Sequence, residues 1–267
     1  STTYRIRGTA GGDKINYAGE VAAKTAEMEV VKLLFQSAAS DRKNGVGGKM
    51  MTADIKDFYL GADLERNEFV RVHKRYIPEA IVVKYNLATF MHNNSVLFEI
   101  NKCMYGLPQA GYLSQRRLID HLMQYGYIQD VNVPCLFQHH ERGTIFTLVV
   151  DDFAINYKRE EDAQHFIDTL NKLYVIKIDK TASKYLGFHI TFDDVKHTVS
   201  FSMPQYIPKV LARFFPNEII RGAKSPAIYT PPNYGRGDQI EVEDTSQSLN
   251  EAEIKRLQEI IGSLLFY

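Results

Sequence analysis

The stretch TIFTLVVDDFAINY, residues 144–157, decides the fold of this chain. Its apolar start, residues 144–150, predicts a buried strand, and residues 153–157 resume a strand pattern. Asp151 and Asp152 therefore lie at or beside the turn of a hairpin. Adjacent carboxylates repel each other and gain nothing from burial, so solvent, a basic neighbour or a divalent metal ion must compensate them. Taken alone, such a pair is more typical of a solvated turn, because Asp favours turns for its own hydrogen bonds.

A third carboxylate, Asp54, stands near the end of a strand predicted over residues 49–55. Two adjacent strands can bring Asp54 beside Asp151. In two-metal sites for phosphoryl or nucleotidyl transfer, carboxylates from separate strands hold two ions about 4 Å apart. Asp54 can instead be a carboxylate that begins a helix or a turn, and periodicity does not decide between these readings.

Helical and strand patterns alternate over the rest of the chain. Apolar residues at spacings of three and four predict helices over residues 25–40, 109–125, 160–173 and 204–214, and an Asn250/Glu253 capping pattern begins a last one. Pro78 indicates a further short helix. Strands are predicted over residues 49–55, 69–73, 96–100, 135–138, 175–178, 185–192 and 198–201. This alternation indicates an α+β fold with an antiparallel sheet, and residues 221–249 read as a loop or linker.

The composition is that of an ordinary globular protein. Of the 267 residues, 45% are hydrophobic and 24% charged, which excludes disordered and fibrous classes. No stretch approaches the roughly 20 apolar residues that cross a bilayer, so we expect neither a membrane span nor a signal peptide. Cys103 and Cys135 are too few for a disulfide framework or a Cys-rich zinc site, which favours a reducing compartment.

The charges are balanced in number but uneven in position. The chain has 32 Lys and Arg against 32 Asp and Glu, and residues 237–254 hold six of the acids and no Lys or Arg. The remainder therefore carries an excess of six positive charges, which is compatible with a polyanionic partner. An acidic surface loop on an average protein explains the same numbers. His139 and His140, the one adjacent histidine pair, fall in a polar hairpin turn, and we expect them to be solvated.

Six segments, in their order along the chain, together resemble the reverse transcriptase of a copia-type LTR retrotransposon. Val150-Asp151-Asp152 is similar to the family's second catalytic motif. The other segments are YRIRGTA (4–10, a fingers strand), TADIKDFYLG (52–61, the first catalytic motif), MYGLPQAG (104–111), KYLGF (184–188, a primer-side motif) and IGSLLFY (261–267). Each is weak alone, but their order and usual separations make chance a poor explanation.

The resemblance implies a right-hand polymerase. Fingers are expected over residues 1–49 and 65–107, and a palm with an antiparallel sheet over residues 50–64 and 108–192. Residues 193–267 would form the thumb and a linker to a C-terminal part outside this sequence, where the family carries an RNase H domain.

The resemblance also assigns a metal centre. It implies that Asp54 and Asp151 hold two Mg²⁺ ions, with Mn²⁺ able to substitute. Asp152 would lie alongside, and the Ile55 carbonyl is a possible extra ligand. Lys177 would protonate the leaving pyrophosphate, although a Lys in an alternating strand is commonly just solvent-exposed.

Four residues are implied to contact the incoming dNTP. Tyr59 would lie under the sugar and exclude a ribose 2′-hydroxyl, unless it is only a core aromatic of the palm. Gln109, at a helix N-terminus that favours phosphate, would touch the nucleotide, unless it is a plain polar residue at a helix start. Arg5 and Arg7 would bind the triphosphate, unless they simply face solvent.

Leu186 and Gly187 are implied to shape the primer grip, where Gly allows the primer backbone to approach closely. Two departures from the family pattern put fine-tuning for substrate in doubt. Val149 and Val150 stand where an aromatic is common, and residues 108–111 are closer to the retroviral form.

The implied function is an RNA- and DNA-templated DNA polymerase that extends a primer 3′ end with dNTPs. Its partners would be an RNA or DNA template with its primer, and no membrane. We expect a cytoplasmic location in a virus-like particle, or a nuclear one, but not secretion. A catalytically silent nucleic-acid-binding module is the alternative, against which the three aspartates stand. An RNA-templated RNA polymerase would have no use for a large ring at Tyr59.

Overall fold

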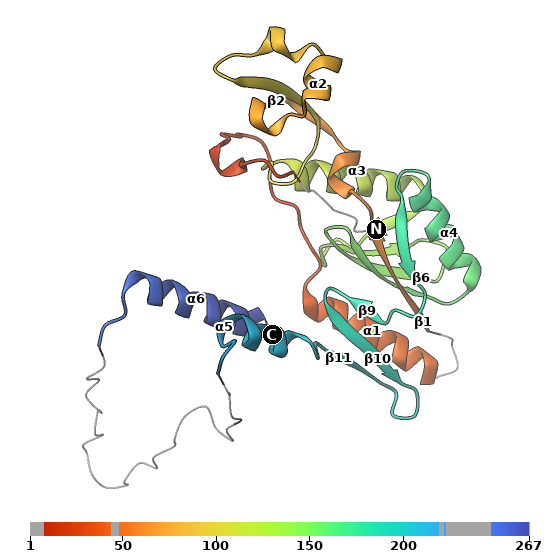
Figure 1. Ribbon diagram of the computed structural model, residues 1–267. Helices are drawn as coiled ribbons and strands as arrows, with labels where there is room; N and C mark the ends of the chain where they lie inside the picture. The colour runs from red at the N-terminus through yellow and green to blue at the C-terminus, as the bar shows by residue number, and fades with distance from the viewer. Residues whose placement is uncertain (1–7, 44–47, 219–221, 223–246, 267) are drawn as a thin grey trace. The chain divides into compact units, whose positions relative to one another are not determined.

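The computed structural model describes residues 8–43, 48–218, 222 and 247–266 (Figure 1). The chain divides into two compact units, Ser1–Phe201 and Ser202–Tyr267. Arg5 and Arg7 lie outside the described residues, as does most of the linker predicted over residues 221–249. Along the described part of the chain, no helix combines the length and the apolar character needed to span a membrane.

A six-stranded antiparallel sheet forms the centre of the first unit, with the strand order β4-β5-β6-β7-β1-β8. In chain order its strands are β1 Lys49–Ile55, β4 Tyr127–Gln129, β5 Leu136–His139, β6 Thr144–Val149, β7 Asp152–Tyr157 and β8 Ile176–Asp179. The hairpin predicted over residues 144–157 is therefore present as β6 and β7. The α+β class with an antiparallel sheet is confirmed.

Helices α3 (Ala110–Gln124) and α4 (Glu160–Asn171) pack on this sheet (Figure 1). Phe146 and Phe153 lie on one face, because residues that pair directly across an antiparallel ladder, and every second residue of a strand, point the same way. Both rings contact Phe166 of α4, at 4.9 and 5.5 Å between centroids. All three side chains are fully buried, so this face carries the main core.

Helix α1 (Met28–Lys43) and a three-stranded sheet in the order β11-β10-β9 pack together beside the central sheet. The small strands are β9 Lys184–Tyr185, β10 Phe188–Asp193 and β11 Thr198–Ser202. Phe35 of α1 is fully buried and contacts one ring from each of them, those of Tyr185, Phe192 and Phe201.

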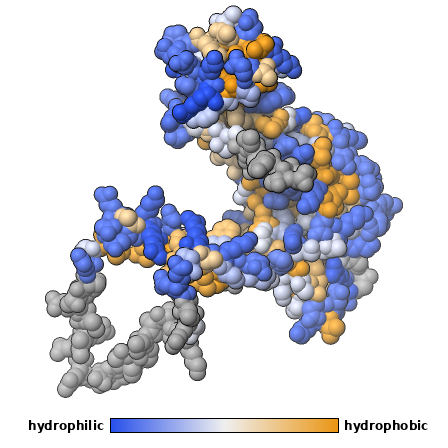
Figure 2. Space-filling view, viewed as in Figure 1, coloured by the Kyte–Doolittle hydropathy of each residue, from blue (hydrophilic) through white to orange (hydrophobic). Residues whose placement is uncertain are grey.

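A two-stranded hairpin forms a separate lobe of the first unit. Its strands, β2 (Asp63–His73) and β3 (Ser95–Lys102), have a register shift between Asp63 and Glu68. The short helices η3 (Lys74–Tyr76), α2 (Glu79–Lys84) and η4 (Leu87–Phe90) connect them over a small core of Val82, Leu87 and Val96. Hydrophobic side chains gather on the surface of this lobe (Figure 2), the exposed ones including Phe69, Val83, Phe90 and Leu97.

The second unit contains α5 (Tyr206–Phe214) and α6 (Glu251–Phe266). The Tyr206 hydroxyl donates to the Ser263 carbonyl at 2.7 Å, and Arg213 pairs with Glu259 at 2.9 Å. The capping box predicted before α6 is confirmed: the Asn250 amide donates to Glu253 Oε2 at 2.9 Å, and the Glu253 amide donates to Asn250 Oδ1 at 3.1 Å. The division into fingers, palm and thumb stays a prediction.

Two expectations were wrong. The strand predicted over residues 185–192 is two strands, because Leu186 and Gly187 form a tight turn with φ of +49° and +86°. His139 is not solvated: it is 9% exposed, and its Nδ1 accepts the backbone amides of Glu141 and Arg142 at 3.0 and 3.1 Å. His140 is exposed as predicted.

Candidate active site

Two carboxylates from adjacent strands, and a third on the turn beside them, lie at one end of the central sheet. Asp54 of β1 is the direct ladder partner of Asp152, the first residue of β7. Directly paired antiparallel residues have Cβ atoms roughly 5 Å apart on the same face of the sheet. Val149 pairs with Asp152, so Val150 and Asp151 form a two-residue turn between β6 and β7. The fold therefore produces the juxtaposition that the sequence only suggested.

The turn that carries Asp151 has a strained backbone. Val150 has φ of +58°, a left-handed conformation that a β-branched residue rarely adopts and that costs of order 1–3 kcal/mol. The Ile55 amide of β1 donates to the Asp151 carbonyl at 3.1 Å, which ties this turn to the neighbouring strand. Holding Asp151 at the tip of the hairpin thus needs the neighbouring strand.

The electrostatics of the cluster disfavour three simultaneous charges. Burial, followed by the charges of Asp151 and Asp54, raises the pKa of Asp152 to about 6. Asp152 is half-buried and Asp54 is exposed. Neither forms an ion pair with another described residue. A bound cation would reduce this repulsion.

A cavity of about 770 Å³ opens beside the aspartates. Asp54 and Asp152 line it together with Lys177, Leu186 and Gly187. Lys177 of β8 is exposed and pairs with Asp54 across the ladder, so its side chain lies on the same face. Five residues chosen from the sequence for three different roles therefore border one space.

The turn between β9 and β10 lies at the edge of this cavity. Leu186 and Gly187 both have positive φ, the requirement of a type I′ two-residue turn. A Cβ on Gly187 would meet no atom within 4 Å, so the backbone there faces open space. This open backbone is compatible with the close approach predicted for a primer.

Tyr59 lies on η2 (Phe58–Gly61), just after β1, and is half-buried. Its ring is 4.8 Å from that of Tyr105, nearly edge-on. Burial and then the nearby charge of Asp151 raise the pKa of Tyr59, which places its ring in the field of the catalytic turn. Tyr59 also packs against the main core, and its role at an incoming nucleotide stays a prediction.

Gln109 is at the N-cap of α3 but is only 1% exposed. Its Nε2 donates to Glu68 Oε1 at 3.0 Å, and the same carboxylate oxygen accepts Arg66 Nε at 2.6 Å. Its Oε1 is buried without a hydrogen-bond partner among the described residues. A residue of β2, Glu68, therefore fixes the side chain of Gln109, while Gln109 Oε1 has no hydrogen-bond partner among the described residues. In this conformation the side chain is buried.

The donor set fits a magnesium centre that the substrate completes. Within the described ranges, no three His, Cys, Asp or Glu side chains converge as a ready-made metal site. Mg²⁺ does not need one, because it keeps several waters and takes one or two carboxylates plus substrate phosphates. Hard carboxylate oxygens, and the repulsion that raises the pKa of Asp152, match this chemistry.

Sequence reasoning missed the side chains that tie the β9–β10 hairpin to the central sheet. Thr52 Oγ1 donates to the Lys184 carbonyl at 3.2 Å, and the Tyr185 hydroxyl donates to the Asp152 carbonyl at 3.3 Å. Thr52 is two residues before Asp54, and Tyr185 directly precedes the Leu186-Gly187 turn. Proximity to the motifs was the only signal in the sequence.

The family model for reverse transcriptase (RNA-dependent DNA polymerase) matches residues 4–218. The chain belongs to the reverse transcriptase family. The resemblance to the copia-type enzymes is thereby confirmed. The α+β class with an antiparallel sheet is the one that this resemblance implied.

Solved telomerase structures are also similar to this reverse transcriptase domain, at low identity. Apo telomerase from Candida tropicalis has 9% identity and a TM-score of 0.39, covering 72% of this chain and 40% of that one. The apo telomerase of Candida tropicalis truncated from the C-terminal domain has 13% identity and a TM-score of 0.37, covering 67% of this chain and 41% of that one. Telomerase from Candida albicans in complex with the TWJ fragment of telomeric RNA has 8% identity and a TM-score of 0.37, covering 73% of this chain and 38% of that one. The chain spans about two fifths of these telomerases, a likeness too weak to assign a role to any residue.

Proposed function

We propose that this domain is an RNA- and DNA-templated DNA polymerase that extends a primer 3′ end with dNTPs. The observation that carries the proposal is the register of Asp54 with Asp152, with Asp151 on the intervening turn, at the edge of a cavity that the Leu186-Gly187 turn also lines. Family membership supports the same reaction class.

Asp54 and Asp151 would hold two Mg²⁺ ions, with Asp152 alongside and the Ile55 carbonyl as an additional oxygen donor. When bound, the metals supply charge stabilisation for the attacking hydroxyl and the leaving phosphate. The chain's own contribution is positional: the β1–β7 ladder sets the spacing of the carboxylates, and the strained Val150 turn holds Asp151 at the hairpin tip.

Lys177 would protonate the leaving pyrophosphate. Its ammonium belongs to the residue that pairs with Asp54, and it lines the same cavity. Leu186 and Gly187 would seat the primer backbone. Gln109 would contact the nucleotide after a conformational change that exposes its Oε1. Arg5 and Arg7 would bind the triphosphate.

Tyr59 would exclude ribonucleotides, because its ring borders the turn that holds Asp151. A clash in a packed site costs on the order of 1–3 kcal/mol, and each 1.4 kcal/mol is about tenfold in selectivity. Single-nucleotide insertion with dNTP and rNTP tests this: Tyr59→Ala should lower discrimination about tenfold or more, while Tyr59→Phe keeps it. An unchanged ratio in Tyr59→Ala would make Tyr59 a core residue only.

Primer extension on RNA and DNA templates, with Mg²⁺ and with EDTA, tests the function itself. Asp151→Asn should lower the rate by at least about a thousandfold, because an amide is a poorer ligand for a hard cation at nearly the same volume. Asp168→Asn, an exposed aspartate of α4, is the matched control and should keep full activity. Extension by a folded Asp151→Asn protein at the wild-type rate would rule out the metal role. A wild-type protein that binds primer-template but adds no nucleotide would favour the silent binding module.

A further inference from the structure

The β9–β10 hairpin is attached to the catalytic strands by two side chains. Thr52 of β1 donates to the carbonyl of Lys184 at 3.2 Å, and Tyr185 of β9 donates to the carbonyl of Asp152 at 3.3 Å. Lys184 and Tyr185 are the two residues directly before the Leu186-Gly187 turn. Each hydrogen bond therefore joins a strand that carries a site aspartate to the strand that carries the turn.

The Tyr185 ring is buried, and its hydroxyl donates to the Asp152 carbonyl. The residue is 4% exposed, and its ring lies 6.1 Å from that of Phe35 on α1. Burial raises the pKa of the phenol, so the hydroxyl remains a donor at neutral pH. A buried ring with a fixed hydroxyl leaves little freedom to the backbone carbonyl that accepts from it.

We infer that Tyr185 is a positioning residue, which sets Asp152 and the Leu186-Gly187 turn at a fixed separation through its hydroxyl. The inference rests on the proposed function, because that separation is the distance between the metal centre and the end of the primer. The Asp152 carbonyl belongs to the residue that pairs with Asp54, so a shift of this carbonyl changes the spacing of the carboxylates. Thr52 of β1 makes the second connection, through its hydrogen bond to the Lys184 carbonyl.

Tyr127→Phe is a matched control for Tyr185→Phe. Tyr127 is also buried in the core of the same unit, and its hydroxyl hydrogen-bonds to His165 Nδ1 at 3.0 Å. Tyr127 lies on β4, at the far edge of the sheet from β1, and it does not line the cavity. Each variant keeps its ring and loses one hydrogen bond, so both should lose a similar amount of stability.

The test measures Mn²⁺ binding by electron paramagnetic resonance on the full chain without nucleic acid, and hydrogen exchange over residues 150–154 and 184–188. Tyr185→Phe should raise the Mn²⁺ Kd at least threefold and speed exchange in both segments, while Tyr127→Phe does neither. In single-nucleotide insertion, Tyr185→Phe should lower the maximal rate about tenfold with the primer Kd unchanged. Thr52→Val should change the Mn²⁺ Kd, the hydrogen exchange and the maximal rate in the same directions, but by less.

The inference and the function can fail separately. A wild-type protein without polymerase activity would defeat the function, while a raised Mn²⁺ Kd in Tyr185→Phe would still support the positioning role. Equal Mn²⁺ affinity and equal exchange in Tyr185→Phe and Tyr127→Phe would overturn the inference, whatever the activity.

Discussion

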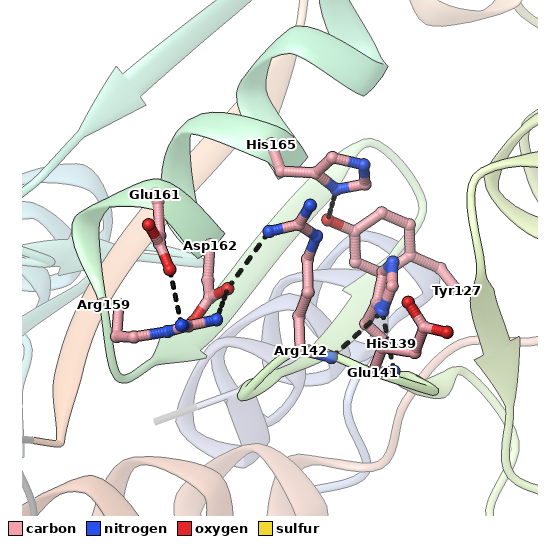
Figure 3. Close-up of polar contacts among 8 residues, drawn as sticks. All are labelled: Tyr127, His139, Glu141, Arg142, Arg159, Glu161, Asp162 and His165. Carbon is pink, nitrogen blue, oxygen red and sulfur yellow. Dashed lines mark hydrogen bonds and ion pairs between the residues drawn. The ribbon is translucent and has the colours of Figure 1, made fainter.

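Asp152 and Asp162 are both removed from solvent in the same unit, yet their surroundings are opposite. Asp162 of α4 has a fully buried side chain, which accepts two hydrogen bonds from Arg159 at 3.0 Å and one from Arg142 at 3.4 Å (Figure 3). These contacts, the Arg159 hydrogen bonds first, lower the pKa of Asp162. Burial, and then the charges of Asp151 and Asp54, raise the pKa of Asp152 to about 6.

The difference separates an acid that the protein pairs with arginines from one that has no ion pair among the described residues. A buried carboxylate is tolerable when the protein supplies its counter-charge, and Asp162 has two guanidinium groups. Asp54 and Asp152 form no ion pair among the described residues, although Lys177, Lys180 and Lys184 line the same cavity.

The Asp162 cluster also fixes the opposite end of β6 from the catalytic turn. Arg142 lies in the β5–β6 turn, and His139 accepts two backbone amides of that turn, including the one of Arg142 (Figure 3). Burial, then the neighbouring His140, His165 and Arg142, lowers the pKa of His139. A neutral His139 can accept at Nδ1, so this end of the sheet is held by satisfied polar groups.

Asp162→Asn should give the largest effect on stability. The amide keeps the volume of the side chain but leaves Arg142 without its ion pair and Arg159 with Glu161 alone. We expect a loss of about 2–3 kcal/mol in the free energy of unfolding, below the full value for a buried pair because Arg159 is 60% exposed. Urea unfolding at pH 7 measures it, with the exposed Asp168→Asn as the control. A loss below about 0.5 kcal/mol would erase the contrast between the two acids.

Asp152→Asn should change the free energy of unfolding in the opposite direction, and by less. The folded pKa of about 6 lies above the ordinary 3.8, so the native state binds the extra proton between these values and stability falls as the pH rises through them. Above pH 6 the variant should therefore be more stable than wild type, on the order of 1 kcal/mol, and below about pH 4 the two should agree. Unfolding in EDTA across this pH range checks the sign. Equal stability at pH 8 would mean that the cluster is not strained electrostatically.

Adding Mg²⁺ should give the smallest effect. At a cation concentration twice its Kd, binding to the native state alone stabilises by about 0.7 kcal/mol. We expect thermal unfolding to shift upward by the corresponding amount in wild type and in Asp162→Asn, and not in Asp54→Asn. A shift that survives in Asp54→Asn would place the cation elsewhere on the molecule.

The positions of the motif residues could largely be predicted from the sequence, because the patterns that reveal them span only a few residues. An apolar strand interrupted by two aspartates predicts a hairpin with its carboxylates at the tip, and β6 and β7 have this form. Asp54, at the end of a second strand, needed only the pairing of β1 with β7 to reach Asp152. The roles of these residues remain proposals, and Arg5 and Arg7 lie outside the described residues.

What the sequence by itself determined was the identity and order of the elements and the chemistry at their ends, since periodicity and turn residues act over a few positions. Only the tertiary structure decided which side chains neutralise or hold one another. The Arg142–Asp162 pair, the burial of Gln109 under Glu68 and the bond from Tyr185 to Asp152 each join separate elements. A periodic pattern shows that one face of a strand is buried, but not which element covers it, and that choice is made when the layers pack.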